Sequence, residues 1–163
     1  MTKQLNLGTF IPEILEMISK QAAVQGITIK LEIMENTPTI KGDPTQLQQV
    51  LLNLINNAID AIIKKHGYEG GELVVGTRPL DSNHVEIYVK DNGSGISPDN
   101  LKKIFTPFFT TKPVGKGTGL GLSVCYGIIS KMGGKMGVSS NENMGTTFSL
   151  QLKADGPFEN IHP

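Results

Sequence analysis

Two asparagines, Asn53 and Asn57, stand four residues apart in a stretch whose apolar residues recur at helical spacing. Residues four apart on a helix lie next to one another on one face. An amide is a poor choice inside a helix and needs hydrogen-bonding partners when it is buried. The pair, flanked by Asn56 and Asp60, therefore indicates a polar site. A helix end or a solvated edge would show the same spacing, so other residues must decide.

A second polar cluster, residues 91–96 (DNGSGI), directly follows a predicted strand at residues 84–90. Asp91 then lies at the end of that strand, where its carboxylate can accept a hydrogen bond from an exocyclic amine. Glycines at positions 93 and 95 allow the backbone to pass close to another group. Asp-x-Gly is also a common turn sequence, so this cluster alone leaves both interpretations open.

A third cluster, residues 117–123 (GTGLGLS), opens another predicted helix. Glycine-rich backbone N–H groups that lead into a helix N-terminus form an anion site, and phosphate is the expected occupant. The cluster is not a P-loop, because Lys116 is followed by Gly117 rather than by Ser or Thr. A dinucleotide-binding fold would place such a motif after an early strand.

Three phenylalanines, Phe105, Phe108 and Phe109, lie between the two glycine clusters in residues 105–112 (FTPFFTTK). The surrounding segment is too polar and irregular for a protein core, and a loop of this length usually has a function. We expect the three rings to anchor the loop, and an anchored loop can act as a lid.

Helices and strands are mixed along the chain, and neighbouring strands need no crossover helix. We therefore expect an α+β fold: a two-layer α/β sandwich with one mixed, mostly antiparallel sheet packed under three helices. The pattern predicts one domain over residues 1–153 and a tail or linker over residues 154–163. The predicted helices are residues 9–25, with Pro12 in the first turn, 44–66, begun by Asp43, and 120–132. The predicted strands are residues 27–33, with one buried face, 72–77, 84–90, 135–140 and 146–153, with a turn at 81–83.

Composition excludes several classes of function. Fifteen basic residues balance fifteen acidic ones, with a pI of about 6.8, so no broad field would hold nucleic acid or an anionic membrane. Cys125 is the only cysteine in the 163 residues, which excludes an internal disulfide and a thiolate pair for zinc. No long apolar run or signal-peptide pattern is present, so we expect a soluble, cytoplasmic piece whose parent can be membrane-anchored.

Taken together and in order, four segments resemble the N, G1, F and G2 boxes of sensor histidine kinases, within the GHKL ATPase superfamily. They are residues 49–58 (QVLLNLINNA), 91–96, 105–112 and 117–122, and Gly145-Thr146 matches the family's further Gly-Thr element. The resemblance covers nearly the whole chain. It implies a Bergerat-type fold and the catalytic and ATP-binding domain of a two-component kinase, which binds Mg·ATP under a flexible lid.

The resemblance also implies a role for each motif. Asn57 would coordinate Mg²⁺, Asn53 would be the catalytic residue beside the phosphates, and Asp91 would accept a hydrogen bond from the adenine amine. Phe105, Phe108 and Phe109 would anchor the lid. The implied ATP-binding residues are Asn53, Asn57, Ala61, Asp91, Gly93, Gly95, Ile96, Lys112, Lys116, Gly117, Thr118, Gly119, Leu120, Gly121, Leu122 and Thr146.

Two positions depart from the family pattern. Many members carry a basic residue three positions after the metal-binding asparagine and an aromatic residue next, where this chain has Asp60 and Ala61. Because Asp60 is not basic, the cation that binds phosphate is expected to be Lys112 or Lys116 instead.

Histidine kinases pair this domain with a dimeric helical hairpin whose histidine accepts the γ-phosphoryl group. His66, His84 and His162 do not stand in such a segment, and each is interpreted as structural or solvated. We therefore expect an isolated catalytic domain that does not phosphorylate itself. Its partner would be the helical dimerisation domain of the parent kinase and, indirectly, a response-regulator receiver domain, without nucleic acid or direct membrane contact.

The alternative class is a nucleotide-dependent binding protein or conformational switch of the same superfamily, such as an anti-sigma-factor kinase, a chaperone or a gyrase-like ATPase. The F box and Asn53 favour the histidine kinases over this class, because superfamily members that cleave ATP with water generally carry glutamate at the position of Asn53.

Overall fold

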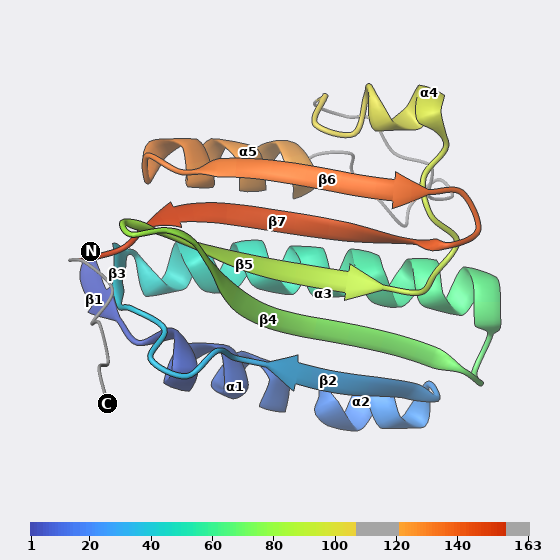
Figure 1. The fold of residues 1–163 in the computed structure, drawn as a ribbon. Coiled ribbons are helices and arrows are strands. Elements are labelled where there is room, and N and C mark those ends of the chain that lie inside the picture. The colour runs from blue at the N-terminus through green and yellow to red at the C-terminus, as the bar shows by residue number, and fades with distance from the viewer. Residues whose placement is uncertain (107–120, 156–163) are drawn as a thin grey trace.

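A computed structural model describes residues 1–106 and 121–155 and shows a five-stranded sheet with helices on one face (Figure 1). The strand order is β2-β4-β5-β7-β6; β2 pairs parallel to β4, and the other pairs are antiparallel. The strands are β2 (Ile27–Glu32), β4 (Gly71–Asp81), β5 (His84–Asp91), β6 (Lys135–Asn141) and β7 (Gly145–Lys153). This architecture confirms the predicted two-layer α+β sandwich.

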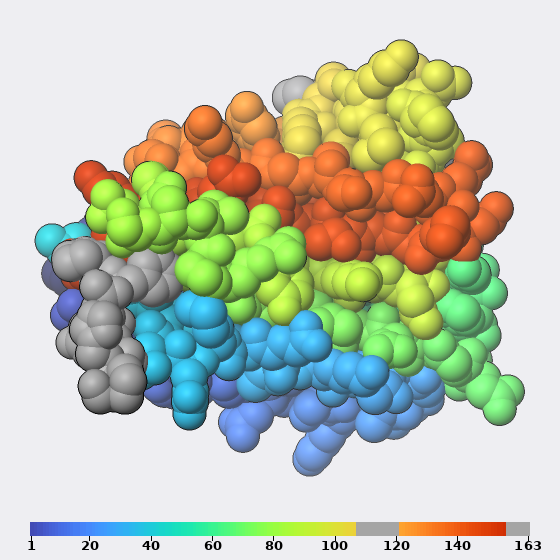
Figure 2. Space-filling view, in the orientation of Figure 1, coloured from blue at the N-terminus to red at the C-terminus, as the bar shows by residue number. Residues whose placement is uncertain are grey.

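The helical layer consists of α1 (Leu7–Glu16), α2 (Ser19–Val24), α3 (Pro44–His66) and α5 (Gly121–Lys131). None of the helices in the described part of the chain covers the opposite face of the sheet, which is turned to the viewer in Figure 2. A short helix, α4 (Pro98–Leu101), lies in the segment after β5, and β1 (Lys3–Leu5) pairs antiparallel with β3 (Ile40–Gly42). None of the described helices is both long and apolar enough to cross a membrane.

The central strands have the predicted alternation. Side chains at alternate positions of β5 and β7 point into the layer between sheet and helices, and all are buried: Val85, Ile87, Val89, Thr146, Phe148, Leu150 and Leu152. A turn at residues 82–83 joins β4 to β5, as predicted.

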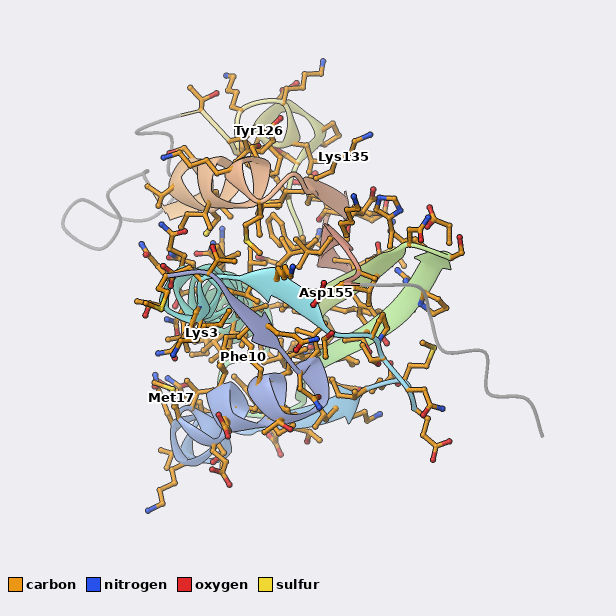
Figure 3. All side chains as sticks on the ribbon, turned by 90° about the vertical axis from the view of Figure 1, so that its left-hand side faces the viewer. Lys3, Phe10, Met17, Tyr126, Lys135 and Asp155 are labelled. Carbon is orange, nitrogen blue, oxygen red and sulfur yellow. The ribbon has the colours of Figure 1, made fainter. Side chains whose placement is uncertain are left out.

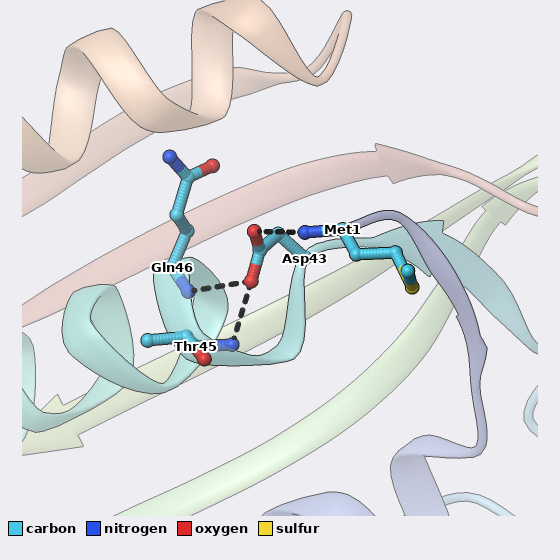
Figure 4. Close-up of polar contacts among 4 residues, drawn as sticks. All are labelled: Met1, Asp43, Thr45 and Gln46. Atoms are coloured by element: carbon cyan, nitrogen blue, oxygen red, sulfur yellow. Dashed lines mark hydrogen bonds and ion pairs between the residues drawn. The ribbon is translucent and has the colours of Figure 1, made fainter.

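Helix α3 begins and ends at the predicted residues. The Asp43 carboxylate accepts hydrogen bonds from the amides of Thr45 (2.9 Å) and Gln46 (3.4 Å), and its other oxygen contacts the Met1 ammonium at 2.8 Å (Figure 4). An acidic N-cap followed by proline is a strong start signal for a helix. Gly67 ends the helix with a positive φ of 67°. This 23-residue helix carries both asparagines of the candidate site.

The prediction of one N-terminal helix over residues 9–25 is wrong. The segment forms α1 and α2, because the amides of Met17 and Ile18 bond to carbonyls three residues back, which tightens and ends the first helix. Because α1 starts at Leu7, Pro12 lies inside the helix rather than in its first turn.

The predicted buried face of the first long strand is only partly present. Ile27 is buried, but Leu31 is 44% exposed. Strand β2 is an edge strand of the sheet, so it has a neighbouring strand on one side only.

After β7, the amides of Ala154 and Asp155 donate hydrogen bonds of 2.7 Å to the carbonyls of Asn83 and Thr39.

Candidate functional site

The side chain of Asp91 lies at the end of β5 and is 5% exposed. Its Oδ1 accepts a 2.8 Å hydrogen bond from the amide of Gly93. Burial raises the pKa of Asp91 to about 6, although hydrogen bonds from the amides of Gly93 and Thr146 act in the opposite direction. None of the ion pairs found among the described residues involves this carboxylate. A buried carboxylate held by neutral amides suits a neutral donor such as an amine.

The loop after Asp91 packs directly on α3. The amide of Ser94 donates a 3.0 Å hydrogen bond to the carbonyl of Ala61, and a Cβ atom on Gly93 would fall 2.5 Å from the Ala61 carbonyl carbon. The close approach expected at Gly93 is therefore made to the backbone of the helix, and its approach to a nucleotide stays a prediction. Ala61, which replaces the aromatic residue of the family pattern, lies at this contact.

The same loop is joined to the turn between β6 and β7. Gly95 has a positive φ of 71°, and a Cβ atom there would fall 2.1 Å from the carbonyl oxygen of Asn141. The amide of Asn143 donates to the Ser94 carbonyl (2.6 Å), and the amide of Ile96 donates to Ser140 Oγ (2.8 Å). Gly95 and Ile96 thus place the loop between helix and sheet edge.

Thr146 of β7 is the direct cross-strand partner of Asp91 and is 4% exposed. Its hydroxyl lies 2.8 Å from Ser140 Oγ of β6. The two predicted residues Asp91 and Thr146 are therefore brought together by sheet register. Sequence reasoning missed Ser140, since only the β6–β7 pairing shows that it belongs to this row.

Asn53 lies on the α3 face towards α5. It lines a surface groove of about 350 Å³ formed by uncharged residues of α3: Thr45, Gln48, Gln49, Leu52, Asn53 and Asn56. A Cβ atom on Gly121, the first residue of α5, would fall 3.1 Å from Asn53 Oδ1. Asn57 follows one helical turn later and is half-buried. The structure thus places Gly121 beside Asn53, and a nucleotide contact for either residue stays a prediction.

Cys125, one turn into α5, is a neighbour of Asn53 that sequence reasoning did not assign to the site. Its thiol is fully buried and lies 3.9 Å from the Val50 carbonyl oxygen. Burial raises the pKa of Cys125 to about 11, while a hydrogen bond with Asn53 acts in the opposite direction.

Phe105 is the one predicted lid anchor that lies among the described residues. It packs partly buried against the core, and its ring centroid lies 5.2 Å from that of Tyr126, which stands on α5 near the α4 segment (Figure 3). Leu122 also packs partly buried against the core. The other predicted residues of the lid and phosphate loop lie outside the described residues: Phe108, Phe109, Lys112, Lys116, Gly117, Thr118, Gly119 and Leu120.

Asn92, between Asp91 and Gly93, ties the site to the end of α3. Its side chain accepts from the amide of Glu72 (2.9 Å) and donates to the Gly70 carbonyl (3.1 Å), and its own carbonyl lies 2.7 Å from His66 Nε2. His66 thus makes a hydrogen bond within the fold. His84 contacts the exposed Asp81 at 2.8 Å, and His162 lies outside the described residues.

Comparison with known proteins places this chain in a family. Residues 42–156 match the family model described as "Histidine kinase-, DNA gyrase B-, and HSP90-like ATPase". The sensor histidine kinase ZraS of Escherichia coli (strain K12) is 41% identical over 148 residues, which are 91% of this chain and 30% of ZraS. Sporulation kinase E of Bacillus subtilis (strain 168) is 35% identical over 152 residues, 93% of this chain and 20% of that kinase. The chain thus spans less than a third of the length of these relatives.

Solved structures agree with the sequence relatives. The catalytic domain of the histidine kinase ThkA superposes with a TM-score of 0.81 at 32% identity, covering 94% of this chain and 98% of that domain. Full-length ShkA in complex with AMPPNP gives a TM-score of 0.82 at 28% identity, covering 96% of this chain and 32% of ShkA. The chain therefore belongs to the histidine kinase-, DNA gyrase B- and HSP90-like ATPase family, as a catalytic ATPase domain of the sensor histidine kinase type.

Proposed function

We propose that this chain binds Mg·ATP and, within its parent protein, donates the γ-phosphoryl group to a histidine on a separate helical dimerisation domain. The observation that carries the proposal is the pairing of the buried Asp91 with Thr146 at one end of the sheet, beside the helix that carries Asn53 and Asn57. The AMPPNP complex of the related ShkA supports a nucleotide as the ligand.

Asp91 would recognise the base. Its carboxylate is mostly ionised at neutral pH, because its pKa of about 6 lies below 7. An ionised carboxylate accepts hydrogen bonds only, so it complements the exocyclic amine of adenine. Gly93 keeps the following loop against α3, and its amide holds the Asp91 carboxylate by a hydrogen bond.

Asn53 and Asn57 would serve the phosphates and the metal. Mg²⁺ prefers oxygen ligands and is commonly held by one or two protein groups together with phosphate oxygens and water. The described residues hold no cluster of three His, Cys, Asp or Glu side chains that could bind a metal alone. The amide oxygen of Asn57 fits a metal that arrives with the phosphates, and Mg²⁺ would there neutralise phosphate charge. Of the predicted phosphate contacts, Lys112 and Lys116 lie outside the described residues.

The phosphoacceptor domain and a receiver domain are proposed partners. Asn53 lines an uncharged groove along α3. This groove leaves space for the acceptor domain beside the proposed position of the phosphates. The related ThkA has been solved in complex with the response regulator TrrA, which supports a receiver domain as an indirect partner. We place the domain in the cytoplasm, where ATP is available, without direct contact with membrane or nucleic acid.

Phosphotransfer in a mixture of two purified domains tests the proposal. The chain is incubated with γ-labelled ATP, Mg²⁺ and the parent's helical dimerisation domain, and the label on that domain is measured. We expect acid-labile label on one histidine, abolished when the acceptor histidine is replaced by glutamine and strongly reduced by Asp91→Asn. Nucleotide binding without any label on the acceptor would instead favour a nucleotide-dependent conformational switch.

A further inference from the structure

Three polar side chains form one row across neighbouring strands at the end of the sheet. Asp91 of β5 pairs with Thr146 of β7, and Thr146 pairs with Ser140 of β6. Direct cross-strand partners place their side chains on the same face of a sheet. Asp91 and Thr146 are buried on the helix-facing side, and Ser140 is half-buried beside them.

The hydrogen bonds of Ser140 determine where the Thr146 proton points. Ser140 Oγ accepts from the amide of Ile96 (2.8 Å) and lies 2.9 Å from the carbonyl oxygen of Gly145, which can only accept. A hydroxyl has one proton, so the Ser140 hydroxyl donates its only hydrogen bond to the Gly145 carbonyl. The remaining contact, 2.8 Å between Ser140 and Thr146, must then use the proton of Thr146. The Thr146 oxygen keeps lone pairs but has no proton left for a ligand.

We propose that Ser140 is a positioning residue that holds the Thr146 hydroxyl as an acceptor, so that the proposed nucleotide site selects purines with an amino group at C6. This inference rests on the proposed ATP site. Asp91 and Thr146 then present two acceptors side by side, which complement an amine. A C6 carbonyl at the same place would face a carboxylate and a lone pair, and would leave buried polar atoms without partners.

Calorimetry with ADP and IDP, in the presence of Mg²⁺, measures this selectivity. The wild-type chain should bind ADP more tightly than IDP. In Ser140→Ala the Thr146 hydroxyl is free to turn and donate to the C6 carbonyl, and the ADP-to-IDP affinity ratio should fall about threefold to tenfold. The nucleotides also differ at N1, but this difference is common to both proteins and cancels in the comparison.

Control variants separate positioning from a general structural role. Ser140→Ala also removes the hydrogen bond from the Ile96 amide. If that loss were its only effect, the affinities for both nucleotides would fall alike and their ratio would stay unchanged. Ser140→Thr keeps the hydroxyl and should restore the ratio, while Ser139→Ala, on the exposed opposite face of β6, should not change it.

A double-mutant cycle tests whether Ser140 acts through Thr146. Thr146→Val alone should lower the ratio, and Ser140→Ala should change it no further in the Thr146→Val background. An unchanged ratio in Ser140→Ala, or the same change in both backgrounds, would overturn the inference while leaving the ATP site intact. A wild-type chain that binds neither nucleotide would overturn the proposed ATP site, and the inference with it.

Discussion

The backbone of Gly93 lies directly against the backbone of Ala61, so close that a Cβ atom on Gly93 would fall 2.5 Å from the Ala61 carbonyl carbon. Real Cβ atoms do not approach carbonyl carbons this closely, so the loop and the helix would have to separate if Gly93 carried a side chain. The contact therefore couples the position of Asp91 to the helix of Asn53 and Asn57.

Gly93→Ala should weaken both folding and nucleotide binding. The obstacle is backbone of α3, which cannot rotate away as a side chain could. We expect a lower melting temperature and at least a tenfold loss of ATP-analogue affinity, about 1.4 kcal/mol. Gly127→Ala is the matched control in α5: nothing lies within 4 Å of its Cβ position, and alanine in a helix should stabilise by about 0.5 to 1 kcal/mol. Unchanged affinity in Gly93→Ala would contradict the role of this contact.

Asp91→Asn should reduce affinity for adenine nucleotides. The substitution keeps the shape and can keep the bond from Gly93, but it replaces one acceptor oxygen by a donor, which would face the amine of a bound adenine. A mismatch of this kind at a buried site costs about 1 to 3 kcal/mol. Isothermal titration with an ATP analogue measures the loss. Affinity within about twofold of wild type would remove Asp91 from base recognition.

The folding stability of the nucleotide-free chain should depend on pH through Asp91. The folded pKa of Asp91 is raised to about 6 from 3.8, so between these values the folded state binds more protons than the unfolded state. Stability contributed by this group therefore falls as pH rises from about 4 to 6, by up to about 3 kcal/mol. Urea unfolding across this range should show that wild type loses stability relative to Asp91→Asn as pH rises, because Asp43, Glu72 and Asp81 titrate alike in both proteins. The same slope in both proteins would contradict the pKa assignment.

Hydrolysis of ATP by the isolated chain should be slow. The groove beside Asn53 is lined by Thr, Gln, Leu and Asn side chains, none of which can take a proton from attacking water at neutral pH. General-base assistance typically contributes about 10² to 10⁴-fold in rate. Phosphate release should therefore be far below one per second, and Asn53→Glu should raise it. Wild-type turnover of about one per second that Asp91→Asn abolishes would place the chain among the ATPases that use water.

The Cys125 thiol should resist modification in the native state. It is fully buried, and burial raises its pKa to about 11, so very little thiolate is present at pH 8. A thiol reagent such as Ellman's reagent should label the chain only after denaturant is added. Stoichiometric labelling of the folded protein within minutes would show that α5 separates readily from α3.

The sequence by itself determined the elements whose signals are local. Helix α3 could be predicted because its apolar period and the start signal at Asp43 lie within one segment. Strands β5 and β7 could be predicted because alternation along each strand reports one buried face. The end of β5 then placed Asp91 at the edge of the core, and the ordered motifs identified the family.

Only the tertiary structure decided how distant segments meet. The sequence did not reveal the break between α1 and α2, the edge position of β2, the packing of Gly93 on Ala61 or the contact of Ser140 with Thr146. The last two depend on helix packing and strand register, which bring residues that are separate in sequence within hydrogen-bonding distance. Periodicity within one segment carries no information about that pairing, because the free energy that selects it comes from contacts between segments.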